Sequence, residues 1–155
     1  MPFTSRAIQE ATVCVIHEWS MNVPMSRLWW GLTDPNALPH WLGTLIDGEF
    51  VNGDIVTIQH AENYSCISQI LACEPEQLLE MTWKFPDEKL SNLQIRLTSV
   101  DDSIDLILTH SGLGDEAMTY LAGWHTHLLH LEDLLLGRPR SMDKFWSTYE
   151  HLCKI

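Results

Sequence analysis

The residues best suited to chemistry are four histidines in the second half of the chain. His110 lies in the segment LTHSG, and His125, His127 and His130 lie in the segment WHTHLLH. Histidine is the side chain whose charge changes near neutral pH, and it is the commonest metal ligand in proteins. The surroundings of these four histidines therefore decide between three roles, namely catalysis, metal binding and a purely structural one.

Two of these histidines, His127 and His130, are three residues apart. On a helix this spacing places both side chains on one face, where they could chelate zinc. A zinc site needs a third or fourth ligand, but Glu132 and Asp133 project elsewhere and the sequence has no HExxH pattern. We therefore expect no metal, and we interpret His127 and His130 as solvent-facing residues on the polar side of a helix.

The other two histidines are expected on faces that turn toward the interior. His125 follows Trp124 and lies near Leu121 and Leu128 on the same helix, and His110 shares the apolar face of a strand. A histidine in a cavity could orient a polar group of an apolar ligand, or it could act as a general base. The alternative is a core histidine that is hydrogen-bonded to the backbone.

The sequence shows no other catalytic set. Ser111 lacks the GxSxG context of a hydrolase nucleophile. Strand alternation places Glu80 and Asp105 on the solvent face, so a pair of carboxylates for acid and base work is not visible either. We therefore expect no catalytic residues and no cofactor.

Tryptophan is more frequent than a core of this size requires, with 7 residues in a chain of 155. Tryptophan supplies a large, stiff apolar surface with one polar group, which suits either core packing or the wall of an apolar pocket. Core packing is the expected role of most of them, and packing alone would account even for the four that are candidates for a pocket wall. The predicted ligand-binding residues are four of these tryptophans with their neighbours, namely Trp29, Trp41, Trp83, His110, Leu121, Trp124, His125 and Leu128.

A long amphipathic helix between Gly114 and Gly137 positions the later histidines. Its apolar residues recur at alternating steps of four and three, which is typical of one side of a helix. They are Ala117, Leu121, Trp124, Leu128, Leu131 and Leu135. Asp115 suits the positive end of the helix dipole, and Gly137 followed by Pro139 is a stop signal. Such a helix needs a surface to cover, because helices of this length are marginal alone.

The preceding residues predict that surface as a series of strands. Residues 1–10 show no regular pattern, a first strand follows, and two short helices lie between Pro24 and Leu42. Short turns between the later strands require antiparallel pairing, and the alternation of apolar and polar residues leaves one face in water. The predicted strands are Ala11–Met21, Leu45–Val51, Ile55–His60, Tyr64–Cys73, Leu78–Lys84, Leu93–Leu97 and Ile104–His110.

Length and charge limit the class of protein. We predict one domain over residues 1–155, with a core over about 11–137 and an amphipathic tail over 138–155 that docks on its own domain or on another subunit. A net charge of -12, from 9 basic and 21 acidic residues, opposes binding to nucleic acid or anionic lipid. The sequence has no run of 18 apolar residues and no signal-peptide pattern, so we expect a cytoplasmic protein without a membrane partner.

Four segments, in this order, resemble a known family. They are VPMSRLWWGLTDPNALPHWLG (Val23–Gly43), LLEMTWKF (Leu78–Phe85), LILTHSGL (Leu106–Leu113) and AGWHTHLLHL (Ala122–Leu131). The chain resembles the START-like, Bet v 1-like helix-grip (SRPBCC) superfamily, in the branch named after activators of the heat-shock-protein-90 ATPase. The resemblance covers roughly Val13 to Leu136.

The resemblance implies an α+β helix-grip fold. In this fold a curved antiparallel sheet, here of six to seven strands, wraps around a long C-terminal helix, and two short helices follow the first strand. A cavity lies between sheet and helix, with its mouth near the short helices. The co-chaperone that gives the branch its name also has a separate amino-terminal chaperone-binding domain, for which 155 residues leave no room. Chaperone activation is therefore not part of the expectation.

Three functional hypotheses follow. The first is a protein, with a possible relation to stress, that binds a small apolar or amphipathic molecule in the cavity without catalysis. The second is a cyclase- or hydrolase-like enzyme that uses His110 or His125. The third is a protein-interaction module whose partner is another protein or, as a homodimer, a second copy of the chain. Ligand binding leads, because a cavity follows from the implied fold, whereas no catalytic set is visible.

Overall fold

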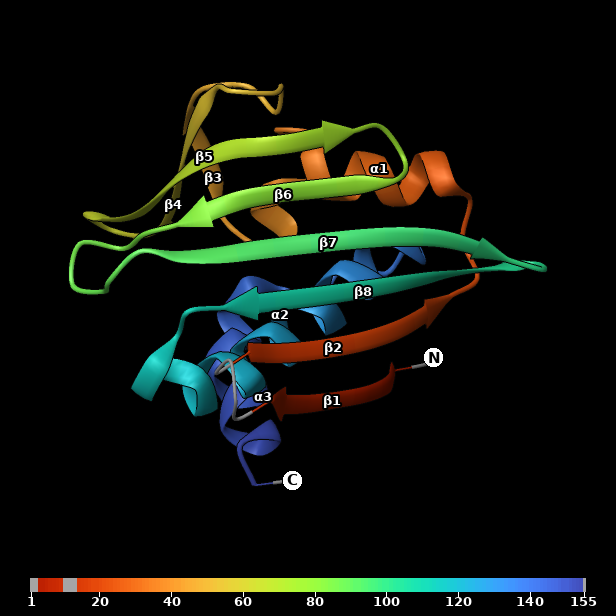
Figure 1. Ribbon diagram of the computed structural model, residues 1–155. Coiled ribbons are helices and arrows are strands. Elements are labelled where there is room, and N and C mark those ends of the chain that lie inside the picture. The colour runs from red at the N-terminus through yellow and green to blue at the C-terminus, as the bar shows by residue number, and fades with distance from the viewer. Residues whose placement is uncertain (1–2, 10–13, 155) are drawn as a thin grey trace.

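The computed structural model of the protein describes residues 3–9 and 14–154, and it shows one antiparallel sheet with helices on one of its faces (Figure 1). The strands are β1 (Phe3–Gln9), β2 (Cys14–Met21), β3 (Thr44–Asp47), β4 (Ile55–Ala61), β5 (Tyr64–Glu74), β6 (Leu78–Trp83), β7 (Ser91–Val100) and β8 (Ser103–Ser111). The α-helices are α1 (Met25–Thr33), α2 (Ala117–Leu135) and α3 (Phe145–Leu152). Three 3-10 turns complete the fold, namely η1 (Leu38–His40), η2 (Gly114–Glu116) and η3 (Met142–Lys144).

The strand order is β1-β2-β8-β7-β6-β5-β4-β3, with every neighbouring pair antiparallel. The strands from β3 to β8 follow one another as hairpins, and β2 joins the far side of β8. Helix α2 crosses behind the middle of the sheet, with α1 behind the β5–β6 end and α3 behind the β1–β2 end (Figure 1). This is the predicted helix-grip fold, which is confirmed together with the two short helices after β2.

The first strand of the sheet was not expected. Residues 1–10 showed no regular pattern, yet Phe3–Gln9 pairs with β2 and brings the sheet to eight strands. The pairing supplies partners for the backbone groups along the open edge of β2, which local sequence periodicity does not reveal. Of the predicted strand Ala11–Met21, residues 11–13 lie outside the described part of the chain, and the rest forms β2.

The core lies between the sheet and α2. Along β7 and β8, alternate residues are buried, and Ile95 pairs with Leu108 as Leu97 pairs with Leu106. Helix α2 covers this face with side chains such as Leu128, which is fully buried. Burial of this alternating apolar surface is the main stabilising contribution to the fold.

Two glycines are required by close approaches of the backbone. At Gly31 in α1, an added Cβ would lie 2.9 Å from Cδ1 of Leu131, so the absence of a side chain lets α1 pack on α2. At Gly48 the φ angle is 87°, and an added Cβ would lie 2.1 Å from the carbonyl oxygen of Ile55. This bend ends β3 at Asp47, earlier than the predicted Val51.

None of the helices in residues 3–9 and 14–154 combines the length and the hydropathy that crossing a membrane would need.

Candidate functional site

A cavity of about 370 Å³ lies between the β4–β6 end of the sheet, the first half of α2 and the C-terminal tail. The sheet and its loops contribute Leu42, His60, Ala61, Tyr64, Trp83, Phe85 and Glu88 to the wall. Helix α2 contributes Thr119, Tyr120, Gly123 and His127, and the tail contributes Met142, Phe145, Trp146 and Tyr149. The volume is within the range of small-molecule sites, and about half of the lining residues are aromatic, as such sites commonly require.

One face of α2 forms the floor of the cavity. Tyr120, Gly123 and His127 follow one another at steps of three and four, so they share one side of the helix. A Cβ added at Gly123 would meet no atom within 4 Å, which shows that the space above this residue is open. The absence of a side chain in the middle of this face therefore leaves room for a ligand.

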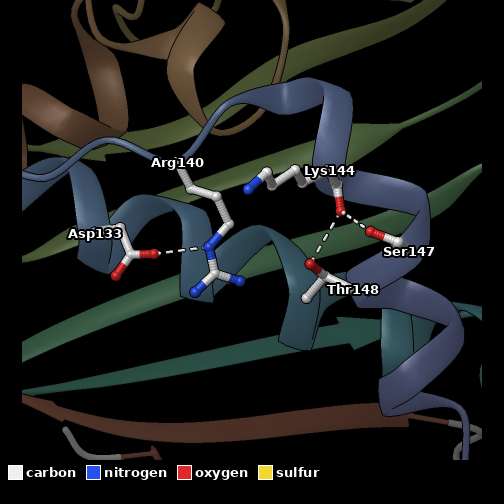
Figure 2. Close-up of polar contacts among 5 residues, drawn as sticks. All are labelled: Asp133, Arg140, Lys144, Ser147 and Thr148. Atoms are coloured by element: carbon white, nitrogen blue, oxygen red, sulfur yellow. Dashed lines mark hydrogen bonds and ion pairs between the residues drawn. The ribbon is translucent and has the colours of Figure 1, made fainter.

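The C-terminal tail is the lid of the cavity and docks on its own chain. Phe145 is only 8% exposed, and its ring centroid lies 4.6 Å from that of His127. Figure 2 shows how the connection is held, with Arg140 Nε 2.9 Å from Asp133 Oδ2 on α2. At the start of α3, the hydroxyls of Ser147 and Thr148 both donate to the carbonyl oxygen of Lys144 (Figure 2).

A short chain of hydrogen bonds runs along one side of the cavity. Trp83 Nε1 donates to the Tyr120 hydroxyl over 3.0 Å, and that hydroxyl donates to Glu88 Oε1 over 2.5 Å. Burial raises the pKa of Glu88, and the neighbouring carboxylates of Glu116 and Asp87 raise it further. Burial and the bond to Glu88 also raise the pKa of Tyr120, so its hydroxyl stays protonated.

Two neutral imidazoles also belong to the wall. Nδ1 of His127 lies 2.7 Å from the carbonyl oxygen of Trp41, and since a carbonyl only accepts, this nitrogen carries the proton and Nε2 keeps its lone pair. Nε2 of His60 is buried and has no hydrogen-bond partner in the described residues. Burial lowers the pKa of His60 to about 3 and that of His127 to about 4. A ligand group that bonds His60 would remove the cost of this unpaired atom.

The solvent-facing positions expected for His127 and His130 are wrong. His127 lines the cavity, and His130 is fully buried, with its ring centroid 5.7 Å from that of Phe145. The reason is the tail, which covers the side of α2 that would otherwise face water. Within the described residues, no group of three His, Cys, Asp or Glu side chains could hold a metal ion.

His110 lies behind the cavity, with both ring nitrogens in hydrogen bonds. Trp124 Nε1 donates to Nδ1 over 2.9 Å, so Nε2 carries the proton and donates to Ser91 Oγ over 2.7 Å. The Ser91 hydroxyl then donates to the carbonyl oxygen of Trp83. Burial lowers the pKa of His110 to about 3. No nitrogen of this ring is left for a ligand.

His125 faces away from the cavity, toward β1 and β2. Its Nδ1 accepts from the Arg6 guanidinium over 2.9 Å, and its ring lies 5.6 Å from that of Trp19 and 5.8 Å from that of His17. Burial, and to a smaller degree the charge of Arg6, lower its pKa to about 4. His110, by contrast, packs against the rings of Tyr120 and Trp124. The two histidines therefore have different neighbours and do not form one site.

Of the eight predicted site residues, Trp83 is the single one among the described lining residues of the cavity. Trp41 is buried and donates from Nε1 to the carbonyl oxygen of Gly31, while Trp124 supports the wall from behind, with its ring 5.2 Å from that of Trp83. Besides the two histidines described above, the remaining three predicted residues pack in or against the core. They are Trp29, Leu121 and Leu128.

Half of the wall residues that sequence reasoning missed come from loops and from the tail, and the other half come from β4, β5 and α2. Phe85 and Glu88 follow β6, and their place near α2 depends on the β6–β7 connection. The aromatic spacing of Phe145, Trp146 and Tyr149 is visible in the sequence, but it does not say which surface the tail covers.

The sheet, the gripped helix and the cavity between them define a START-like, helix-grip protein of the SRPBCC class. The family described as Activator of Hsp90 ATPase homolog 1-like protein matches residues 22–136. The chain belongs to this family, which confirms the resemblance seen in the sequence.

Solved structures with the same fold extend the comparison. CalU16 from Micromonospora echinospora is 21% identical, with a TM-score of 0.78 over 98% of this chain and 92% of that one. The protein BPP1335 from Bordetella parapertussis is 26% identical, with a TM-score of 0.72 over 97% and 86% of the two chains. DynU16, a protein of the dynemicin biosynthetic locus, is 22% identical, with a TM-score of 0.73 over 81% of this chain and 48% of that one. A comparison with curated protein sequences gave no match.

Proposed function

We propose that the protein binds one small apolar or amphipathic molecule in the cavity between the sheet, α2 and the tail, without converting it. The observation that carries this proposal is the aromatic wall around about 370 Å³ of space, with the unpartnered Nε2 of His60 as a polar anchor. The origin of DynU16 in a biosynthetic locus also supports a small-molecule role for this fold. The proposal includes neither chaperone activation nor a stress response.

The alternative of an enzyme that uses His110 or His125 has no support in the geometry. Both nitrogens of His110 are bonded within the core, and His125 faces β1 and β2. A general base must reach the proton that it abstracts in a bound substrate. The cavity wall contains neither residue.

The test uses Gly123, the open position on the cavity floor. The neutral fluorescent probe N-phenyl-1-naphthylamine should bind the wild type at one molecule per chain. Substitution by Ala, Leu and Phe should weaken that binding progressively, to about tenfold or more for Gly123→Phe, because each larger side chain occupies ligand space. Gly123→Ala should also raise the free energy of unfolding by about 0.5 to 1 kcal/mol, since the helix loses a flexible residue and nothing clashes.

Met118→Phe is the matched control, because it places an equally large side chain on the solvent side of the same helix. Its probe affinity should equal that of the wild type. Equal binding by the whole Gly123 series would place the ligand elsewhere. Native mass spectrometry of the protein purified from cells would then identify any molecule carried in the cavity.

A second candidate function, self-association, is favoured by the outer face of the sheet. Ile55 on β4 and Ile67 on β5 are both 52% exposed, and Leu71 on β5 is 48% exposed on the same face. Such a cluster on a sheet favours contact with another surface. If a second copy covers it, the wild type should sediment as a dimer and Ile67→Lys as a monomer at the same concentration. A monomeric wild type at high concentration would remove this candidate.

A further inference from the structure

The described residues that line the cavity have an unusual charge balance. Seven of them are aromatic, namely Tyr64, Trp83, Phe85, Tyr120, Phe145, Trp146 and Tyr149. None of the lining residues is Lys or Arg, and Glu88 is the only carboxylate among them. The histidines of the wall add no positive charge, because His60 and His127 are neutral at physiological pH. The interior therefore presents aromatic rings and one acidic group.

Glu88 is half-buried at the cavity and makes no ion pair within residues 3–9 and 14–154. Its Oε1 accepts from the Tyr120 hydroxyl. The negative charges of Glu116 and Asp87 raise the pKa of Glu88. The positive charge of Lys84 lowers this pKa, but it does not cancel the rise. Nζ of Lys84 donates to the carbonyl oxygen of Phe85, over 2.6 Å. Glu88 thus lacks the counter-charge that would compensate the partial burial of a carboxylate.

We infer that the cavity takes an organic cation, with a tertiary or quaternary ammonium group placed next to Glu88 and an apolar body between the aromatic rings. Aromatic faces attract cations through the ring quadrupole, and the attraction grows when the site excludes water. The carboxylate of Glu88 supplies a negative charge that balances the ammonium group. An anionic ligand would meet one like charge and no basic partner. This inference rests on the proposed function and specifies the ligand class for the same cavity.

The decisive experiment compares two probes of one shape. Phenyltrimethylammonium and tert-butylbenzene differ only in a charged nitrogen in place of a carbon atom. Each is titrated against N-phenyl-1-naphthylamine bound to the wild type and to Glu88→Gln. Because Gln can still accept from Tyr120, the variant should keep the fold. The cation should bind Glu88→Gln about tenfold more weakly than the wild type, while tert-butylbenzene should bind both within about twofold.

Asp115→Asn is the matched control, since it removes an equal charge from an exposed site in η2 that does not line the cavity. It should leave the affinity of the cation within about twofold of the wild type. If tert-butylbenzene competes but the cation does not, or if Glu88→Gln binds the cation as the wild type does, the inference is overturned and the proposed function stands. If neither probe competes and N-phenyl-1-naphthylamine does not bind, the proposed function itself fails.

Discussion

Trp124→Ala should lower the free energy of unfolding by about 4 kcal/mol, although Trp124 touches no ligand space. The side chain is 1% exposed and packs against the rings of Trp83, His110 and His127. Its removal leaves a cavity and also deprives Nδ1 of His110 of its donor. Chemical denaturation near neutral pH measures the loss.

Two further variants separate packing from the hydrogen bond. Trp124→Phe keeps most of the ring but loses the indole donor, so it should cost less, about 1 to 3 kcal/mol. Trp146→Ala is the control for removing an indole, and it should change stability by no more than about 0.5 kcal/mol because Trp146 is 67% exposed. Similar losses for Trp124→Ala and Trp146→Ala would contradict the buried position of Trp124.

Acid should destabilise the protein through its buried histidines well before most carboxylates titrate. His17 and His110 are fully buried, and burial lowers the pKa of each to about 3. An unfolded chain binds these protons near pH 6.5, whereas the folded protein does not. Folding stability is therefore complete above about pH 6.5 and falls as the pH decreases toward 3.

At pH 5 each of these two histidines should remove about 2 kcal/mol of stability, which is a large part of the total for an ordinary domain. His110→Gln tests one share of this loss, because Gln can accept from Trp124 and donate to Ser91 without titrating. The difference in unfolding free energy between pH 7.5 and pH 5 should be about 2 kcal/mol smaller for the variant. An identical pH dependence for both proteins would mean that His110 is not kept neutral by burial.

The sheet and the long helix were predictable because their periodicity is local. Alternation in Ile104–His110 and the 3.6-residue pattern from Ala117 to Leu135 each report which side of an element is buried. Phe3–Gln9 was not predictable in this way, since its strand depends on pairing with the edge of β2. Periodicity describes one element at a time, whereas an edge strand is defined by its neighbour.

The cavity was less predictable than the fold. The sequence places Trp83 and Trp124 on inward faces. Only the tertiary arrangement decides that Trp83 lines the cavity, whereas Trp124 packs behind Trp83 in the core. His127 shows the same limit. Its position on the helix predicts a polar face that is exposed to water. The C-terminal tail covers that face, which therefore becomes an interior wall.

The part of the wall that the tail supplies has a consequence for how the selectivity of this chain can change. The family match ends at residue 136, whereas Met142, Phe145, Trp146 and Tyr149 all lie beyond it. The sheet and α2 hold most of the buried core, and the tail borders the cavity while it buries Phe145 and Leu152. Under the proposed function, substitution of Trp146, which lines the cavity and is 67% exposed, can change which molecule is selected at little cost to folding. The buried Phe145 cannot vary as freely, because its removal would leave a cavity.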